Sequence, residues 1–392
     1  MNTIRVILKP EKDKPIRAFH PWVFSGAIDR LDDHFKTGDL AKVYSNQEEF
    51  LGVGYLNPRS QIAVRMLTFQ DEAIDTSFFI RRMEAAKRLR DDFMPPKTNA
   101  FRLIHSEGDF LPGLIVDRYG EYLVAQFLTA GMDALKPMVT EAMKKVFGAK
   151  GIYERDDSEA RHLEGLEEVL AGLSGEEPPD YVEIEEYGNR FIVDMKHGQK
   201  TGFFLDQREN RKIVADHAKG KKVLNCFAYS GGFSVYAARA GAQSVTSVEI
   251  QERALNTMRT NFELNGLSGD SYRLVCEDVF EFLRKDTDLY DLVVLDPPAF
   301  CKNKNQINQA ARGYKDINLF AMKRMAAGGI LFSSSCSSFI EPDLFQKIVF
   351  GAAKDARRNV QIVKKTSHPF DHPINIYHPE GEYLKGLLLR VE

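Results

Sequence analysis

The sequence predicts an α/β protein, with a C-terminal Rossmann-like domain preceded by a small β-rich domain and a central α+β domain. Three observations predict this fold: short alternating runs before residue 70, a helical pattern followed by strands at 76–128, and a strand-turn-helix-strand pattern after 220. The 392 residues are 43% hydrophobic and 28% charged, which fits two or three globular domains and excludes a disordered or fibrous chain.

Residues 1–70 predict a small, mostly β domain. Apolar and polar residues alternate in "RVILKP", "DLAKVYS", "EFLGVGYLN" and "QIAVRMLTF", and Gly or Pro interrupts the runs, a pattern that is typical of strands. Ten Lys or Arg residues against eight Asp or Glu residues make this segment mildly basic, in a chain of formal charge −3. A local basic surface can bind RNA phosphates, although the net charge does not decide the question.

The central part combines one helix with several strands. Residues 76–94 carry apolar side chains at helical spacing, and residues 100–128 predict strands joined by turns at Gly108-Asp109 and Pro112-Gly113. The acidic, Gly- and Pro-containing "GLSGEEPPD" at 172–180 is the best candidate for a linker. We therefore expect domains at 1–70, 71–178 and 179–392.

The C-terminal part begins with a strand, a Gly-containing turn, a helix and a second strand that ends in Glu249. This acid lies about 20 residues beyond the turn, where a Rossmann-like sheet places a carboxylate for ribose hydroxyls. A nucleoside cofactor is therefore implied. The turn is "NCFAYSGGF" and lacks the G-x-G-x-x-G spacing that cradles a dinucleotide pyrophosphate, which disfavours NAD.

Further strand-like runs end in polar residues. Asp278 follows "YRLVCE", Asp296 ends "YDLVVLD" before two prolines, and Cys336 follows "LFSSS". Because the carboxyl ends of the strands in an open α/β sheet form the ligand crevice, we expect Glu249, Asp278, Asp296 and Cys336 to converge there.

Cysteine spacing and hydropathy limit the other classes of protein. The cysteines at 226, 276, 301 and 336 form no C-x-x-C pair and no zinc-like cluster, so neither disulfides nor a metal site is indicated. The sequence has no apolar run of about 18 residues and no signal-peptide core at its N-terminus. We expect a cytoplasmic protein that does not enter a membrane.

The order "NCFAYSGGF", Glu249, Asp278-Val279, "DPP" and "SCS" resembles class I S-adenosylmethionine-dependent methyltransferases. Within them it is similar to the large-subunit ribosomal RNA cytosine-carbon-5 methyltransferases of bacteria and archaea, which carry an N-terminal PUA domain. Five strings support the resemblance: "PGLIVDRYG", "GQKTGFFLDQRENR", "RGYKDIN", "DHP" and "EYLKGLLLRV".

The resemblance implies an RNA-binding PUA-like domain, S-adenosylmethionine as cofactor and large-subunit ribosomal RNA as substrate. It implies that Cys336 is the covalent nucleophile and that Asp296 contacts the base edge. The implied cofactor-binding residues are Asn225, Phe227, Ser230, Gly231, Gly232, Glu249, Asp278, Val279, Asp296 and Pro297. The RNA-binding candidates are Lys200, Arg208 and Lys302.

Several alternatives stay open at this point. Cys336 could be an inert core thiol, and Glu249 or Asp278 could be a helix cap or turn residue. Cys301 lies out of register with a D-x-P-C motif and is expected to be a loop residue, while Cys226 and Cys276 are expected to pack in the core. A guanine-nitrogen methyltransferase and a noncatalytic RNA-binding assembly factor are alternative functions. The oligomeric state is open, with a homodimer among the options.

Overall fold

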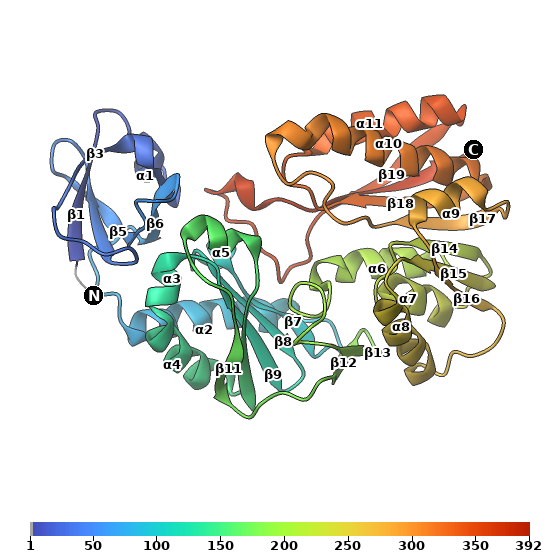
Figure 1. The fold of residues 1–392 in the computed structure, drawn as a ribbon, viewed down its shortest axis with the longest axis horizontal. Coiled ribbons are helices and arrows are strands. Elements are labelled where there is room, and N and C mark those ends of the chain that lie inside the picture. Colours follow the sequence, from blue (N-terminus) through green and yellow to red (C-terminus); the bar gives the residue numbers. More distant parts are fainter. Residues whose placement is uncertain (1–2) are drawn as a thin grey trace. The chain divides into compact units, whose positions relative to one another are not determined.

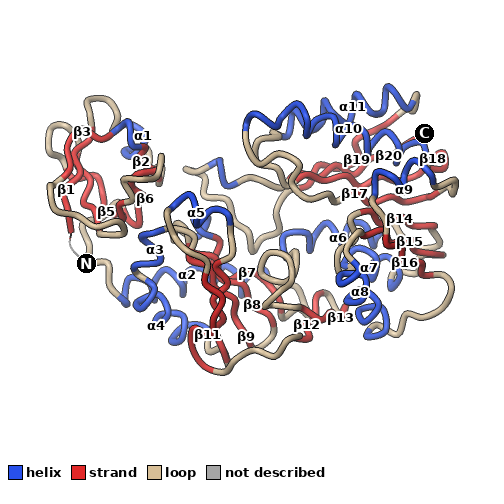
Figure 2. Tube along the Cα trace, in the orientation of Figure 1, coloured by secondary structure: helices blue, strands red, loops and turns tan. Residues whose placement is uncertain are grey.

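A computed structural model describes residues 3–392 (Figures 1 and 2). It has two compact units. The first consists of residues 3–184, Val193–Leu205 and Phe370–Gly381, and the second of Glu185–Ile192, Asp206–Pro369 and Glu382–Glu392. Neither unit is one continuous stretch of sequence. No helix in residues 3–392 is both long enough and apolar enough to span a membrane.

The first unit begins with a six-stranded sheet in the order β2-β6-β5-β4-β1-β3. Its strands are β1 (Thr3–Leu8), β2 (Trp22–Phe24), β3 (Ile28–Leu31), β4 (Leu40–Tyr44), β5 (Phe50–Leu56) and β6 (Ile62–Thr68), with the short helix α1 (Lys14–Arg17) after β1. The inward residues Val6, Val43 and Val64 are fully buried, as period-two alternation requires. The prediction of a mostly β segment is confirmed.

The same unit continues with a five-stranded sheet in the order β11-β10-β9-β8-β7. Its elements are α2 (Thr76–Phe93), β7 (Ala100–His105), β8 (Leu114–Tyr119), β9 (Tyr122–Phe127), α3 (Ala130–Ala134), α4 (Lys136–Phe147), β10 (Gly151–Asp156), α5 (Glu159–Glu164) and β11 (Val169–Gly175). Asp75 is the N-cap of α2, and its side chain accepts a hydrogen bond from the Phe78 amide at 2.9 Å. The helix expected at 76–94 and the strands expected at 100–128 are confirmed.

The linker predicted at 172–180 is wrong in its first half. Residues 172–175 continue β11, where Gly172 pairs with Tyr153 and Gly175 pairs with Gly151. Ladder pairing with β10 outweighs the local preference of Gly and Ser for turns, because each paired residue satisfies its backbone polar groups.

The hydrophobic core of the central elements also includes residues of the N-terminal sheet. Tyr55 of β5 is 1% exposed and packs in the same cluster as Phe78 of α2. Its hydroxyl donates to the carbonyl oxygen of Pro112 at 2.9 Å and lies 2.8 Å from the hydroxyl of Thr129. Gly131 leaves room for the ring, because a Cβ there would lie 2.0 Å from Tyr55 ring atoms. The N-terminal sheet is therefore packed onto the central elements.

The second unit contains a seven-stranded sheet in the order β16-β15-β14-β17-β18-β20-β19. Its strands are β14 (Lys222–Cys226), β15 (Ser244–Glu249), β16 (Tyr272–Cys276), β17 (Tyr290–Leu295), β18 (Met325–Ser335), β19 (Val360–Thr366) and β20 (Lys385–Val391). Strands β14 to β18 pair in parallel, and β20 lies antiparallel between β18 and β19. The hairpin of β12 (Val182–Glu186) and β13 (Asn189–Val193) precedes this sheet in the chain.

Helices cover both faces of the seven-stranded sheet (Figure 2). They are α6 (Arg208–Asp216), α7 (Gly232–Arg239) and α8 (Glu252–Leu264) on one face, and α9 (Val279–Lys285), α10 (Ile307–Lys323) and α11 (Pro342–Ala356) on the other. The chain moves outward from β14 to β16 and then returns to β17 on the other side of β14. This reversal is the switch point at which open α/β sheets bind ligands. The predicted Rossmann-like domain is confirmed.

Candidate active site

The turn after β14 joins the strand to α7 and is held in a tight conformation. Phe227, Tyr229 and Gly231 have positive φ angles of 59°, 45° and 82°. Positive φ is uncommon for residues other than glycine, so these two aromatic positions mark a constrained backbone. A Cβ at Gly231 would lie 2.4 Å from Cγ of Met258, so only glycine fits against α8 at this point.

Two buried polar atoms at this turn are suited to a ligand. Asn225 donates to the Ser234 hydroxyl at 2.8 Å, but its own Oδ1 has no hydrogen-bond partner among residues 3–392, and neither does the Ser230 hydroxyl. Both residues are less than 5% exposed. Buried polar groups are nearly always satisfied, so a polar ligand at this turn would supply the missing partners. The residues present therefore fit a nucleoside cofactor.

Glu249, the last residue of β15, holds the turn from the neighbouring strand. Its Oε2 accepts a hydrogen bond from the Tyr229 amide at 2.9 Å, and its Oε1 accepts one from the Gln251 amide at 2.9 Å. A carboxylate has about four acceptor positions, so two remain for ribose hydroxyls. Glu249 thus combines a structural bond to the turn with the capacity to bind a ribose.

Asp278 has the helix-capping geometry that the sequence left open. It is the N-cap of α9, and its Oδ1 accepts a hydrogen bond from the Glu281 amide at 3.1 Å. Val279 follows it and is 3% exposed. Asp278 lies two residues beyond Cys276, which pairs with Glu249 in the parallel ladder of β15 and β16.

Asp296 directly follows β17 and is fixed by two donors. Its Oδ1 accepts from the Gln207 side-chain amide at 2.7 Å and from the Ser334 hydroxyl at 2.6 Å. Pro297 is buried and Pro298 is exposed, so the chain leaves the sheet immediately after the carboxylate. The two donors hold the Asp296 carboxylate in one orientation at the edge of the sheet.

Cys336 follows β18, the strand next to β17, and is neither buried nor fully exposed. The residues on both sides of it form a network with Tyr314 of α10: the Ser335 hydroxyl donates to the tyrosine oxygen at 3.0 Å, and the Ser337 hydroxyl lies 2.9 Å from it. Asp296 and Cys336 thus leave adjacent parallel strands at the same edge, as the sequence predicted.

The other three cysteines lie in different surroundings. Cys226 is fully buried in β14, and burial raises the pKa of its thiol. Cys301 is a buried loop residue, 2% exposed, and its thiol donates to the Asn303 carbonyl at 3.2 Å. Cys276, which was expected in the core, is exposed at the end of β16, because this strand lies at the edge of the sheet.

The three RNA-binding candidates differ in exposure. Lys200 is exposed in the first unit, with its ammonium group 5.3 Å from the centre of the Phe204 ring. Lys302 is exposed in the second unit. Arg208 is fully buried, and its Nε lies 3.5 Å from the Glu186 carboxylate. A buried, ion-paired guanidinium does not offer its charge to a phosphate at the surface.

Sequence reasoning missed three polar groups at this site. Gln207 and Ser334 orient Asp296, and Lys385 of β20 is 7% exposed and donates from Nζ to the Ser337 carbonyl at 2.6 Å. A signal for Lys385 was present in "EYLKGLLLRV", where a lysine directly precedes the apolar run of a strand. Nothing local in the sequence separates Gln207 from its polar neighbours.

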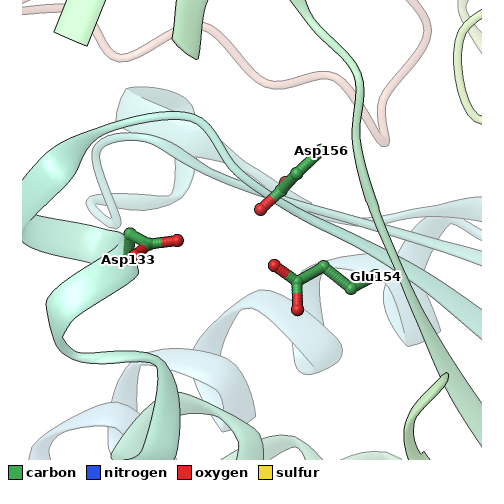
Figure 3. Close-up of side chains that lie close together, drawn as sticks. All are labelled: Asp133, Glu154 and Asp156. Atoms are coloured by element: carbon green, nitrogen blue, oxygen red, sulfur yellow. The ribbon is translucent and has the colours of Figure 1, made fainter. Parts of the chain in front are cut away.

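An acidic cluster in the first unit has a metal-like arrangement, with ligand atoms of Asp133, Glu154 and Asp156 within 4.8 Å of one another (Figure 3). Two cations already occupy it. Lys136 pairs with Asp133 and Glu154 at 2.9 and 2.6 Å, and Arg161 pairs with Asp133 and Asp156 at 3.1 and 2.7 Å. The cluster is an internal ion network whose charge is largely compensated, which does not favour a metal ion.

Comparison with protein families matches two parts of the chain. Residues 160–390 match the S-adenosylmethionine-dependent methyltransferase model, and residues 6–69 match the PUA-like domain model. The chain is 43% identical to Ribosomal RNA large subunit methyltransferase I of Aliivibrio fischeri strain MJ11, over 99% of this chain and 100% of the relative. It is 45% identical to the protein of the same name in Pseudoalteromonas atlantica strain T6c, over 99% of each.

Solved structures with the same fold agree with these matches. A candidate SAM-dependent methyltransferase from Streptococcus mutans is 25% identical, with a TM-score of 0.85 over 99% of this chain and 100% of that one. A candidate methyltransferase solved with SAH is also 25% identical, with a TM-score of 0.85 over the whole of both chains.

Proposed function

Because the chain belongs to the S-adenosylmethionine-dependent methyltransferase family, we propose that it methylates carbon 5 of a cytosine in large-subunit ribosomal RNA, with Cys336 as the covalent nucleophile. The names of the full-length relatives support the ribosomal RNA substrate. The observation that carries the chemistry is the placement of Cys336 and Asp296 at the ends of the adjacent parallel strands β18 and β17.

The cofactor-binding residues proposed here lie along the carboxyl edge of the sheet. S-adenosylmethionine supplies an electrophilic methyl group when it is bound. The turn from Asn225 to Gly232 would hold it together with Glu249, and the buried oxygens of Asn225 and Ser230 that have no partner among residues 3–392 support this assignment. Asp278-Val279 and Asp296-Pro297 complete the proposed set from the two neighbouring loops.

The thiol has the main chemical task in this proposal. Carbon 5 of cytosine is a poor nucleophile, so the Cys336 thiolate adds to carbon 6 and makes carbon 5 electron-rich. Asp296, held by Gln207 and Ser334, contacts the base edge and stabilises the added ring. After methylation, carbon 5 loses its proton to a base and the carbon–sulfur bond breaks, which restores the thiolate.

The remaining parts of the proposal concern RNA and the assembly. The PUA-like segment grips RNA, Lys200 and Lys302 add exposed positive charge, and buried Arg208 acts through its ion pair within the second unit. We keep the division at 1–70, 71–178 and 179–392 as a prediction. A ribosomal RNA substrate is consistent with action in the cytoplasm. A homodimer stays a prediction that light scattering would test.

The decisive test combines mapping with trapping. The protein is incubated with unmodified large-subunit ribosomal RNA and labelled cofactor, and the methyl group is mapped. RNA with 5-fluorocytosine at the mapped position has no carbon-5 proton to lose, so the protein should stay covalently joined to it through Cys336. Attachment through another cysteine would contradict the nucleophile assignment. A methylated guanine would favour the guanine-nitrogen alternative, and no methylation at all would favour an assembly factor.

A further inference from the structure

Lys385 contacts the residues on both sides of Cys336. It is the first residue of β20 and pairs across the sheet with Ser335, the residue before the cysteine. Its Nζ donates to the carbonyl oxygen of Ser337, the residue after the cysteine, at 2.6 Å. The lysine side chain therefore runs past Cys336 from one neighbour to the other.

Burial of the Lys385 ammonium group is energetically unfavourable. The residue is more than nine-tenths buried, at 7% exposure, and its ammonium group forms no ion pair with a carboxylate of residues 3–392. Burying a charge without a counterion is strongly unfavourable, and a single carbonyl offsets only part of the lost hydration. Burial lowers the pKa of Lys385 to about 8. A nearby anion would offset the unfavourable free energy of burying the ammonium group.

We propose that the ammonium group of Lys385 is the counterion that keeps Cys336 ionised in the free protein. Lys385 is a positioning residue in this scheme and does not touch the base. The thiolate so formed is the nucleophile of the proposed function, and the use of this ion pair in RNA methylation rests on that function.

The other groups around the thiol do not replace Lys385. Tyr314 faces it from α10, and burial raises the pKa of this tyrosine, so its hydroxyl stays neutral. Asp296, after β17, is negative and would oppose a thiolate, and its Oδ1 is held by Gln207 and Ser334. Glu382 precedes β20. The charges of Cys336 and Glu382 both raise the pKa of Lys385, against the effect of burial.

The remaining neighbour is the loop after β17. Cys301 contributes a backbone amide, which donates to the Ser337 hydroxyl at 3.2 Å, while its own thiol points to Asn303. The proposed ion pair couples the titration of the Lys385 ammonium group to that of the Cys336 thiol, so the protonation state of each depends on the other.

The charge and proton balance is simple. The thiolate lone pair forms the bond to carbon 6, and the same pair returns to sulfur when that bond breaks. Lys385 stays protonated through both steps and keeps its bond to the Ser337 carbonyl. The carbon-5 proton goes to another base. The lysine therefore changes the fraction of the protein in which Cys336 is a thiolate. Replacing the lysine should lower this fraction most at neutral pH, where an ordinary thiol is mostly protonated.

The test measures alkylation of Cys336 by iodoacetamide between pH 5 and pH 10, with the adduct located by mass spectrometry. Only the thiolate reacts, so the midpoint of the pH profile reports the ionisation of the thiol. Exposed Cys276 in the same sample serves as an internal reference. No RNA or cofactor is needed, so the result is independent of the proposed function.

Four variants separate charge from structure. Lys385→Met removes the charge, Lys385→Gln keeps a hydrogen-bond donor for the Ser337 carbonyl, and Lys385→Arg keeps the charge. Lys365→Met removes an exposed lysine from the adjacent strand β19 and is the matched control. Thermal melting and binding of S-adenosylhomocysteine check that each variant is folded.

The Met and Gln variants should both move the midpoint for Cys336 upward by one pH unit or more, which slows alkylation at pH 7 by about tenfold or more. The Arg and Lys365→Met variants should stay near the wild-type profile. A Gln variant that matches wild type would overturn the proposal, because the hydrogen bond alone would then suffice. So would a Met variant that leaves the profile in place. If the Met variant does not fold, the comparison of Gln with Arg decides. If the midpoint of the Cys336 alkylation profile shifts as expected but the protein methylates guanine, the proposed function is wrong and the proposed ion pair is still supported.

Discussion

The Ser334 hydroxyl donates a hydrogen bond to Asp296 at 2.6 Å and so connects the ends of β18 and β17. Ser334→Ala removes one of the two donors to Oδ1 of Asp296. A hydrogen bond to a charged group contributes about 1.5–3 kcal/mol, so we expect kcat to fall by roughly 10- to 100-fold if Asp296 must hold the base. The measurement is single-turnover methylation of the mapped RNA.

The neighbouring serine provides a matched control for this prediction. Ser333 is equally buried, but its hydroxyl has no hydrogen-bond partner in the described residues 3–392. Ser333→Ala should therefore leave the rate unchanged and leave the protein as stable or more stable. Equal losses of activity in the two variants would mean that the Ser334 bond has no special part in the reaction.

Replacement of the proposed nucleophile should separate chemistry from binding. Cys336→Ala should lose methyl transfer by several orders of magnitude, while the affinities for RNA and S-adenosylhomocysteine stay within about threefold of wild type. Cys301→Ala should remain largely active, because that thiol is buried and bonded to the Asn303 carbonyl. Single-turnover rates and equilibrium titrations of both variants check this. An active Cys336→Ala enzyme would refute the covalent mechanism.

Glu249 should contribute to cofactor affinity in two ways that two variants can distinguish. Glu249→Ala removes both the ribose contact proposed for it and the acceptor of the Tyr229 amide, so S-adenosylhomocysteine should bind at least tenfold more weakly. Glu249→Gln keeps one acceptor oxygen and should lose less. Titration calorimetry measures both. Unchanged affinity in the Ala variant would show that the ribose assignment is wrong.

The contribution of the N-terminal segment is better tested by charge than by deletion. Removing residues 1–70 would take Tyr55 out of the core that it shares with Phe78, and the rest of the unit would lose packing as well as RNA contacts. Four exposed basic residues of this segment form no ion pair among the described residues: Lys9, Lys12, Lys36 and Arg59.

Changing these four residues to glutamine should weaken RNA binding and make its dependence on salt less steep, because fewer counterions are released. Affinity for S-adenosylhomocysteine should not change. Filter binding between about 50 and 200 mM salt measures the slope. A slope equal to that of wild type would place the RNA-binding surface elsewhere on the protein.

Asp156 should make the stability of the protein depend on pH. Burial, helped by the hydrogen bond with Glu154, raises the pKa of Asp156 to about 8, against an ordinary value of 3.8. Between these two values the folded state holds a proton that the unfolded state has lost. The free energy of unfolding therefore contains a contribution from Asp156 that decreases as the pH rises from 4 to 8.

Asparagine resembles the protonated carboxyl group, so Asp156→Asn should lose less stability than wild type between pH 5 and pH 8. Urea unfolding at several pH values in this range measures the difference. If the two proteins lose stability in parallel over the range, Asp156 is already ionised in the folded state.

The sequence could predict the positions of those site residues that lie at the ends of strands. The placement of Glu249, Asp296 and Cys336 at one edge of the sheet could be predicted because each ends or follows an apolar strand, and parallel strands bring such residues to the same edge. The contact of Lys385 depends on the register between β18 and β20, and the contact of Ser334 with Asp296 depends on the register between β18 and β17. No local pattern in the sequence encodes either register. Burial of Arg208 against Glu186 likewise follows from tertiary packing, whereas the resemblance made Arg208 a candidate for RNA binding.

Strand β20 lies between β18 and β19, yet it follows both of them in the chain. During synthesis, the edges of β18 and β19 that will pair with β20 stay unpaired until β20 has been made. Until residues 385–391 leave the ribosome, β18 presents an open edge that can pair with another nascent chain. The same insertion brings Lys385 to Cys336, so an incomplete chain would carry a thiol that is not yet activated. With the role proposed for Lys385, the order of translation would delay formation of the thiolate until β20 has paired with β18.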